Sequence, residues 1–243
     1  MNSIIITCEH GGNRIPACFS HLFKNKSKLL NSHLGWDPGA LELAKSIAAR
    51  FRNSAFFYEK ISRLVIDQNR SLTNKRVFSS ITATLSSEQK SQIISTVYAP
   101  YHTAITSCIE KLLNNSSSVY HFSIHSFTPV LNGVVRDADM GLLYDPGMGL
   151  ERDMCLRLTE KIKNEIPGIR IRRNYPYKGT SDGLTTALRM RFCNLKYAGI
   201  EIETNQFHVL KKTRLWNAVM EKLPDCIREI IGASSAPIKN QKP

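Results

Sequence analysis

The chain has 243 residues, and 33 Lys+Arg stand against 20 Asp+Glu, which gives a formal net charge of +13. Hydrophobic residues make up 42% and charged residues 22%, a composition that excludes a disordered or fibrous protein. No apolar run approaches the ~18 residues that a membrane-spanning helix needs, and the first residues lack the basic region of a signal peptide. We expect one domain over 1–243, with a flexible tail at 233–243.

Apolar patterning along the chain predicts strands that alternate with helices. The segments that read as extended are 3–8, 54–58, 61–67, 119–125, a strand pair within 134–143, 168–172 and 197–203. The segments with helical spacing are 40–51 after a possible Asp37 cap, 86–113 with a kink at Pro100, 150–166, a helix capped by 181–182 and running to 192, and 213–231. This alternation predicts an α/β fold with a mostly parallel sheet covered by helices on both faces.

The six cysteines are scattered and form no C-x-x-C pair. They indicate reduced thiols in a cytoplasmic protein and argue against a structural zinc held by cysteine pairs. The basic surplus raises nucleic acid and other anions as partners. However, the Lys and Arg residues are dispersed, and zinc-finger spacing, an aromatic RNA-binding signature and a basic helix are all missing. Dispersed charge favours a solvated surface, so we expect neither nucleic acid nor a membrane as partner.

Histidines and carboxylates follow or belong to three predicted strands. His10 follows the strand at 3–8, His125 ends the strand at 119–125, Glu201 lies in the last strand, and Asp37 precedes the first helix. Ligands of such sheets bind beyond the carboxyl ends of the strands. Two imidazoles and one carboxylate are a frequent ligand set of catalytic zinc, and a further carboxylate can transfer the proton of a water molecule.

Each of these residues also has a structural interpretation. A histidine at a strand end can be hydrogen-bonded without binding a metal, and Asp37 can be a helix cap. Glu201, in an apolar strand, must be paired, protonated or associated with a metal.

Two other segments are candidates for substrate binding. Asn69 and Arg70 are suited to a carboxylate, since a guanidinium donates two parallel hydrogen bonds and an amide a third. The alternative is a surface ion pair between Asp67 and Arg70, worth less than ~1 kcal/mol. The loop over 174–183, with Asn174 and Tyr177, either lines a site or only connects a strand to a helix.

Six short motifs carry a resemblance to a known family. They are CEHGGNRIP (8–16), GWDPGA (35–40), SRLVIDQNR (62–70), IHSFTP (124–129), NYPYKG (174–179) and GIEIETN (199–205). In this order, and over nearly the whole chain, the set resembles the N-formylglutamate amidohydrolase family. The resemblance implies a three-layer αβα fold of the phosphorylase/hydrolase-like type, similar to zinc carboxypeptidases and zinc-dependent peptidoglycan amidases.

The resemblance also implies a metal site and a catalytic carboxylate. His10, Asp37 and His125 would hold Zn²⁺ or another divalent metal, and Glu201 would be the catalytic carboxylate. The carboxypeptidase pattern places a Glu three residues after the first histidine, where this chain has Asn13. The carboxylate ligand must then come from elsewhere, from Asp37 or from another residue.

For the substrate, the resemblance implies a small carboxylate. Asn69 and Arg70 match the pair that holds the substrate's carboxylate, Arg136 is a second anchor, and Asn174 and Tyr177 belong to a matched motif. Many family members carry an Arg two residues after the catalytic Glu. Here that position is Glu203, which disfavours an acidic side chain on the substrate.

We therefore expect an amidohydrolase that cleaves N-formyl or N-acyl amino acids, present as a monomer or small homo-oligomer. The alternatives are a carboxypeptidase or peptidoglycan-type amidase with a larger substrate and, in another class, a non-enzymatic protein that binds anions or nucleic acid.

Overall fold

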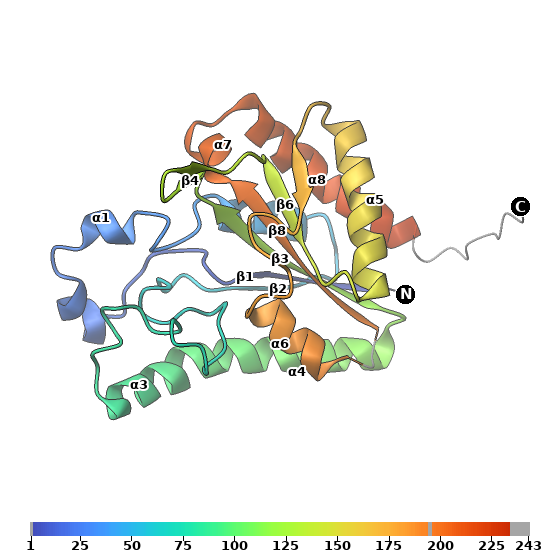
Figure 1. Cartoon of the computed structure of the whole chain (residues 1–243). Coiled ribbons are helices and arrows are strands. Elements are labelled where there is room, and N and C mark those ends of the chain that lie inside the picture. The colour runs from blue at the N-terminus through green and yellow to red at the C-terminus, as the bar shows by residue number, and fades with distance from the viewer. Residues whose placement is uncertain (1, 194–195, 234–243) are drawn as a thin grey trace, which may run out of the picture.

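The centre of the molecule is a six-stranded sheet in the order β2-β1-β3-β8-β6-β7 (Figure 1). The structure is a computed structural model that describes residues 2–193 and 196–233, so the tail predicted at 233–243 lies outside the described residues except for Ala233. The strands of this sheet are β1 (Ser3–Cys8), β2 (Ala55–Tyr58), β3 (Val119–Phe127), β6 (Met140–Leu143), β7 (Ile171–Arg173) and β8 (Tyr197–Asn205). Among the described strand pairs of this sheet, β6–β8 alone is antiparallel, which confirms the predicted mostly parallel sheet.

Helices cover both faces of the sheet and complete the predicted three layers (Figure 1). One face packs against α2 (Ala40–Ala48), α5 (Gly149–Glu165) and α8 (Arg214–Ala233). The other packs against α4 (Ala99–Asn115) and α6 (Leu184–Arg191). The smaller elements are a 3₁₀ helix (Ala17–Phe23), α1 (Ser27–Leu30), α3 (Ser87–Ile93), α7 (Gln206–Leu210) and the hairpin of β4 (Val130–Leu131) with β5 (Val134–Val135). None of the helices among the described residues combines the length and the apolar character of a membrane span.

The two faces of the central strands differ in chemistry. Successive side chains of a strand point to opposite faces. In β3, Phe122 and Ile124 enter the apolar core under α2, α5 and α8. The alternate residues His121, Ser123 and His125 are polar and also buried, on the face toward α4 and α6. A buried polar band therefore runs along this face toward the carboxyl ends of the strands.

Two predicted elements are wrong. The segment 61–67 is not a strand, because its only ladder contact is an isolated bridge between Arg14 and Ile61. Val65 N–H instead donates to Ser62 O at 2.9 Å, so the chain turns there. The strands within 134–143 do not pair with each other, since β5 pairs with β4 and β6 lies in the main sheet.

The two predicted helix caps, Asp37 before α2 and the pair Ser181–Asp182 before α6, are wrong as well. Gly39, with φ +80°, precedes α2, and no side chain caps it, so Asp37 is not a helix cap. Gly183 precedes α6, and the first N–H of that helix, on Leu184, donates to the distant Asn69 Oδ1 at 2.7 Å. The long helix predicted at 86–113 is present as α3 and α4, joined by a π-helical turn at Ile94–Tyr98, just before Pro100.

Candidate active site

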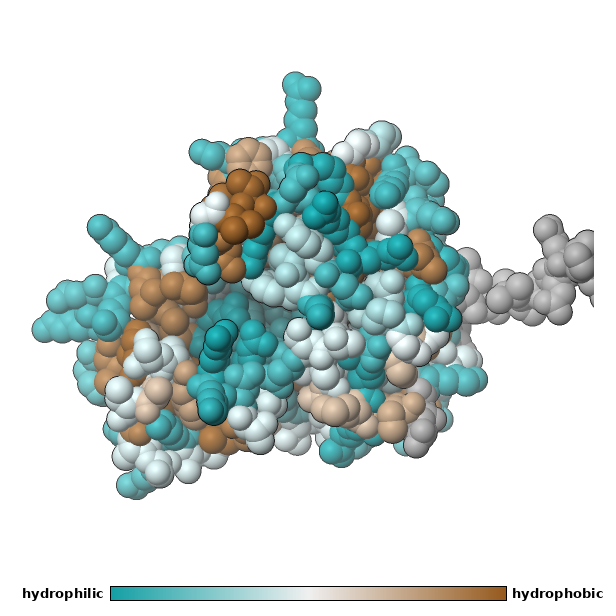
Figure 2. Space-filling view, in the orientation of Figure 1, coloured by the Kyte–Doolittle hydropathy of each residue, from teal (hydrophilic) through white to brown (hydrophobic). Residues whose placement is uncertain are grey.

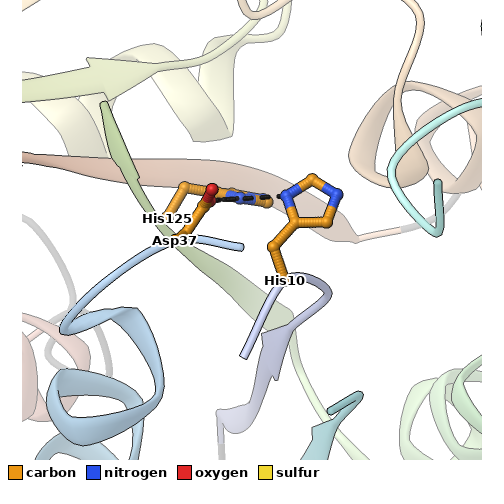
Figure 3. A group of neighbouring side chains, drawn as sticks. All are labelled: His10, Asp37 and His125. Atoms are coloured by element: carbon orange, nitrogen blue, oxygen red, sulfur yellow. Dashed lines mark hydrogen bonds and ion pairs between the residues drawn. The ribbon is translucent and has the colours of Figure 1, made fainter. Parts of the chain in front are cut away.

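The three predicted metal ligands come together at the carboxyl ends of β1 and β3 (Figure 3). His10 follows β1, His125 lies near the end of the neighbouring β3, and Asp37 lies in the turn before α2. One donor atom from each lies within 4.8 Å of the others. The Nδ1 atoms of His10 and His125 lie 3.4 and 2.9 Å from the same oxygen, Oδ2 of Asp37. Both rings thus present the same nitrogen to one carboxylate.

The opposite nitrogens of both rings contact buried carboxylates. His10 Nε2 lies 2.6 Å from Asp67 Oδ1, and His125 Nε2 lies 2.9 Å from Glu9 Oε2. Metal-binding histidines typically donate their other ring N–H to a carboxylate or carbonyl, which sets the tautomer and the orientation of the ring. The donor set therefore fits a metal ion bound through both Nδ1 atoms and Asp37.

The charges around the cluster also fit a divalent cation. Glu9, Asp37 and Asp67 are buried, and Arg63 is the guanidinium that pairs with Asp67, at 2.8 Å. Three carboxylates against one guanidinium leave a surplus of two negative charges when the imidazoles are neutral. Burial favours the neutral form of His125, but its hydrogen bonds to Asp37 and Glu9 raise its pKa well above the ordinary value. A metal ion at this site would take the place of the proton that His125 otherwise binds between these two carboxylates.

A cavity of about 180 Å³ opens beside these three residues. All the described residues that line it have polar or charged side chains, and Tyr177 is the one phenol among them. The lining residues are His10, Asp37, Arg63, Asn69, Arg70, His125, Ser126, Tyr177, Lys178, Ser181, Asp182, Glu201 and Glu203. The face shown in Figure 2 has a hollow with hydrophilic walls near its middle. A larger and more open groove of about 830 Å³, beside α5 and β7, contains none of the predicted metal ligands and only Asn174 of the predicted substrate-binding residues.

Two carboxyl groups of β8 reach this cavity, and they differ in their partners. Glu201 Oε1 accepts a hydrogen bond from Thr185 Oγ1 at 2.6 Å. Glu203, beside His125 in the sheet register, is 5% exposed, and its Oε2 has no hydrogen-bond partner. Burial, with the nearby negative charges of Asp37 and Glu201, raises the pKa of Glu203 to about 8. Glu203 therefore has a free carboxyl oxygen beside the candidate metal ligands.

Asn69 and Arg70 both line the cavity, next to His125. The Oδ1 of Asn69 accepts from Leu184 N–H, which leaves its amide nitrogen 3.3 Å from His125 Nε2. Arg70 donates to Asp182 O at 2.6 Å. Asp67 pairs with His10 and Arg63, so the predicted surface ion pair between Asp67 and Arg70 is wrong.

Of the remaining predicted residues, Tyr177 lines the cavity and Arg136 and Asn174 do not. Arg136 donates to the hydroxyl of Tyr177 at 3.1 Å, and its guanidinium lies over that ring, 5.0 Å from the centroid. The Oδ1 of Asn174 accepts from the N–H groups of Tyr144 and Gly179, so its side chain braces the loop over 174–179.

Sequence reasoning assigns no role to Glu9, Arg63 or Ser123, all of which contact the cluster. The signal for Glu9 is its position beside His10, directly after a buried strand, and the signal for Ser123 is its spacing of two from His125. For Tyr101, whose hydroxyl donates to Glu9 from α4, no local signal exists.

The three-layer fold and the His-Asp-His cluster beside a polar cavity define an α/β enzyme with a candidate metal centre. The sequence profile of the N-formylglutamate amidohydrolase family matches residues 2–207, and the chain belongs to this family. No curated protein matches the chain significantly.

Solved structures of similar fold cover nearly the whole chain. The gene product Atu2144 of Agrobacterium tumefaciens is 25% identical, with a TM-score of 0.81 over 96% of this chain and 92% of that one. An N-formylglutamate amidohydrolase from Ralstonia eutropha is 17% identical, with a TM-score of 0.69 over 95% of this chain and 93% of that one. A putative carboxypeptidase A from Shewanella denitrificans is more distant, at 13% identity and a TM-score of 0.42, over 96% of this chain and 58% of that one.

Proposed function

We propose that this protein is a zinc-dependent amidohydrolase that cleaves the amide bond of an N-formyl or N-acyl amino acid. The observation that carries the proposal is the buried His10–Asp37–His125 cluster at the wall of a small polar cavity. These three residues would hold Zn²⁺ or another divalent metal. When bound, such a metal supplies Lewis acidity toward a water molecule and toward the carbonyl oxygen of the amide.

We assign the proton transfer to Glu203 and not to Glu201, the catalytic carboxylate that the family resemblance implies. A general base needs a free oxygen close to the water that it deprotonates. Glu203 lies beside His125 in the sheet register and offers an unpartnered oxygen, whereas one oxygen of Glu201 is held by Thr185. In this proposal Glu203 accepts the proton of the attacking water and returns it to the leaving nitrogen. Glu201 is the second candidate, since it lines the same cavity.

The substrate's carboxylate would bind Arg70 and the amide nitrogen of Asn69. The amide of Asn69 is preoriented because its oxygen is held by Leu184 N–H. Holding the substrate in this way fixes the amide relative to the cluster, and such orientation contributes several kcal/mol to catalysis. Tyr177, which lines the cavity, and Arg136, which donates to its hydroxyl, would form an outer anchor.

The size and charge of the cavity restrict the substrate further. A volume of about 180 Å³ lies below the ~300 Å³ at which pockets for drug-sized ligands begin, so it suits an acylated amino acid better than a peptide or a glycan strand. The carboxyl group of Glu201, which lines the cavity, disfavours a second carboxylate on the substrate.

The proposal is tested by offering the zinc-loaded protein N-formyl and N-acetyl derivatives of acidic, neutral and aromatic amino acids, beside short peptides and muropeptides. We expect turnover of small N-formyl amino acids, with neutral polar side chains preferred to acidic ones. Turnover confined to peptides or muropeptides would favour the carboxypeptidase or amidase alternative.

The expected cellular setting stays a proposal. All six cysteines are free, as expected of a cytoplasmic protein in which thiols stay reduced. We propose a cytoplasmic enzyme, monomeric or in a small homo-oligomer, which sedimentation at several concentrations would test.

A further inference from the structure

Glu9 is a fully buried carboxylate, and its partners are neutral hydrogen-bond donors and one histidine. Its Oε2 lies 2.5 Å from Ser123 Oγ and 2.9 Å from His125 Nε2. Its Oε1 accepts from the Tyr101 hydroxyl at 3.1 Å. Among the ion pairs of the described residues, Glu9 has His125 as its partner and neither a lysine nor an arginine.

A chain of buried polar groups also ends on Glu9. The Thr7 hydroxyl hydrogen-bonds to Glu9, and His121 Nε2 lies 2.8 Å from Thr7 Oγ1. His121 Nδ1 lies 2.7 Å from the hydroxyl of Tyr197. If Thr7 donates to Glu9, it must accept from His121 Nε2–H, and His121 Nδ1 must then accept from Tyr197. Every donor in this chain then points toward Glu9.

The two histidine-supporting carboxylates are therefore unequal. Asp67 divides its oxygens between His10 and the guanidinium of Arg63, which compensates part of its charge. Glu9 has no such cation, and its O–H donors hold the carboxylate against the single ring of His125. A buried carboxylate without a cation is costly, and in this geometry its charge can be balanced only through His125 and whatever the opposite ring nitrogen binds.

We infer that Glu9 is a positioning residue: it orients His125 so that Nδ1 faces Asp37, and it makes His125 the stronger of the two imidazole ligands for a divalent metal. The inference rests on the proposed metal site. Glu9 does not line the cavity, so it acts through His125 and not on the substrate. Loss of such a partner typically lowers metal affinity by ~10–100-fold.

The test uses Glu9→Gln, which keeps the size of the side chain and removes its charge. Zn²⁺ affinity is measured by competition with a chromogenic chelator, and the visible spectrum of the Co²⁺-loaded protein reports ligand geometry. The matched control is Glu151→Gln, because Glu151 is another fully buried carboxylate, paired with Arg189 at 2.9 Å and not among the residues that line the cavity. We expect Glu9→Gln to weaken Zn²⁺ binding ~10–100-fold and to shift the Co²⁺ bands. Glu151→Gln should change neither.

Glu9→Asp keeps the charge but lengthens the contact with His125. It also provides a test if Glu9→Gln does not fold. It retains a buried carboxylate but withdraws it by one methylene from His125 Nε2, so the inference predicts weaker Zn²⁺ binding here too. Wild-type affinity and an unchanged Co²⁺ spectrum in the folded Glu9 variants would overturn the inference, and so would equal losses in Glu151→Gln. If the wild-type protein itself binds no Zn²⁺ or Co²⁺, the proposed function fails instead, and the two failures are thereby distinguished.

Discussion

His121 gives a prediction about stability that tests the polar band behind the active site. This histidine is fully buried between Thr7 and Tyr197, and burial lowers its pKa to about 4, from an ordinary value of 6.5. In the unfolded chain the ring binds a proton as the pH falls through 6.5, while in the folded protein it stays neutral until about pH 4. Its contribution to stability is therefore complete above pH 6.5 and is lost as the pH falls toward 4.

The size of this effect follows from the two pKa values. One pKa unit corresponds to 1.36 kcal/mol, so a shift of roughly 2.5 units gives a loss of about 3 kcal/mol between pH 7 and pH 4. His121→Gln removes the titrating group, while its amide can still donate to Thr7 and accept from Tyr197. Other groups also contribute to acid destabilisation, but they contribute equally in both proteins.

The assay is urea denaturation of the wild type and His121→Gln at pH 4, 5, 6 and 7, followed by circular dichroism. The free energy of unfolding should fall less in the variant, with a difference between the two proteins of about 3 kcal/mol when pH 4 is compared with pH 7. Parallel pH profiles would refute the reasoning, because His121 would then be protonated equally in the folded and unfolded chains.

Three further substitutions test the site itself. Glu203→Gln should lower kcat by ~10²–10⁴-fold with zinc still bound, and Glu201→Gln should lower kcat less. Steady-state kinetics gives kcat, and metal analysis gives the zinc content of each variant. A larger loss of kcat in Glu201→Gln than in Glu203→Gln would assign the proton transfer to Glu201. Asp37→Asn should weaken Zn²⁺ binding in chelator competition by more than the ~10–100-fold expected for an outer partner, and an undiminished zinc content would exclude Asp37 as a ligand. Arg70→Ala should raise KM by ~10–100-fold with a smaller effect on kcat, since a charged hydrogen bond to the substrate is lost, whereas an unchanged KM would place the substrate's carboxylate elsewhere.

The regular part of the fold follows from local patterns in the sequence. Apolar residues on one face of 119–125 and 197–203 predict two strands, and the structure contains both, extended to Phe127 and Asn205. The meeting of His10, Asp37 and His125 could be expected as well, because β1 and β3 are parallel neighbours whose carboxyl ends share one edge of the sheet.

The irregular segments could not be predicted, because distant partners determine them. Asp67 turns inward to His10, and Arg63 pairs with Asp67, which bends a segment whose residues locally favour a strand. Asn69 accepts from the first N–H of a helix 115 residues away, a contact that no local capping signal shows. Glu203 differs from Glu201 only through its partners, and no pattern along β8 reveals which carboxyl oxygen lacks a hydrogen bond.

We propose that the cluster of His10, Asp37 and His125 makes this chain a metal-dependent amidohydrolase of small acylated amino acids. The most direct measurement follows formate release from N-formyl amino acids by the metal-free protein during titration with Zn²⁺. We predict that activity rises with added zinc and saturates at one equivalent, and that Asp37→Asn shows no such rise. Formate release that is independent of zinc, or that is absent at full occupancy of the site, would contradict this claim.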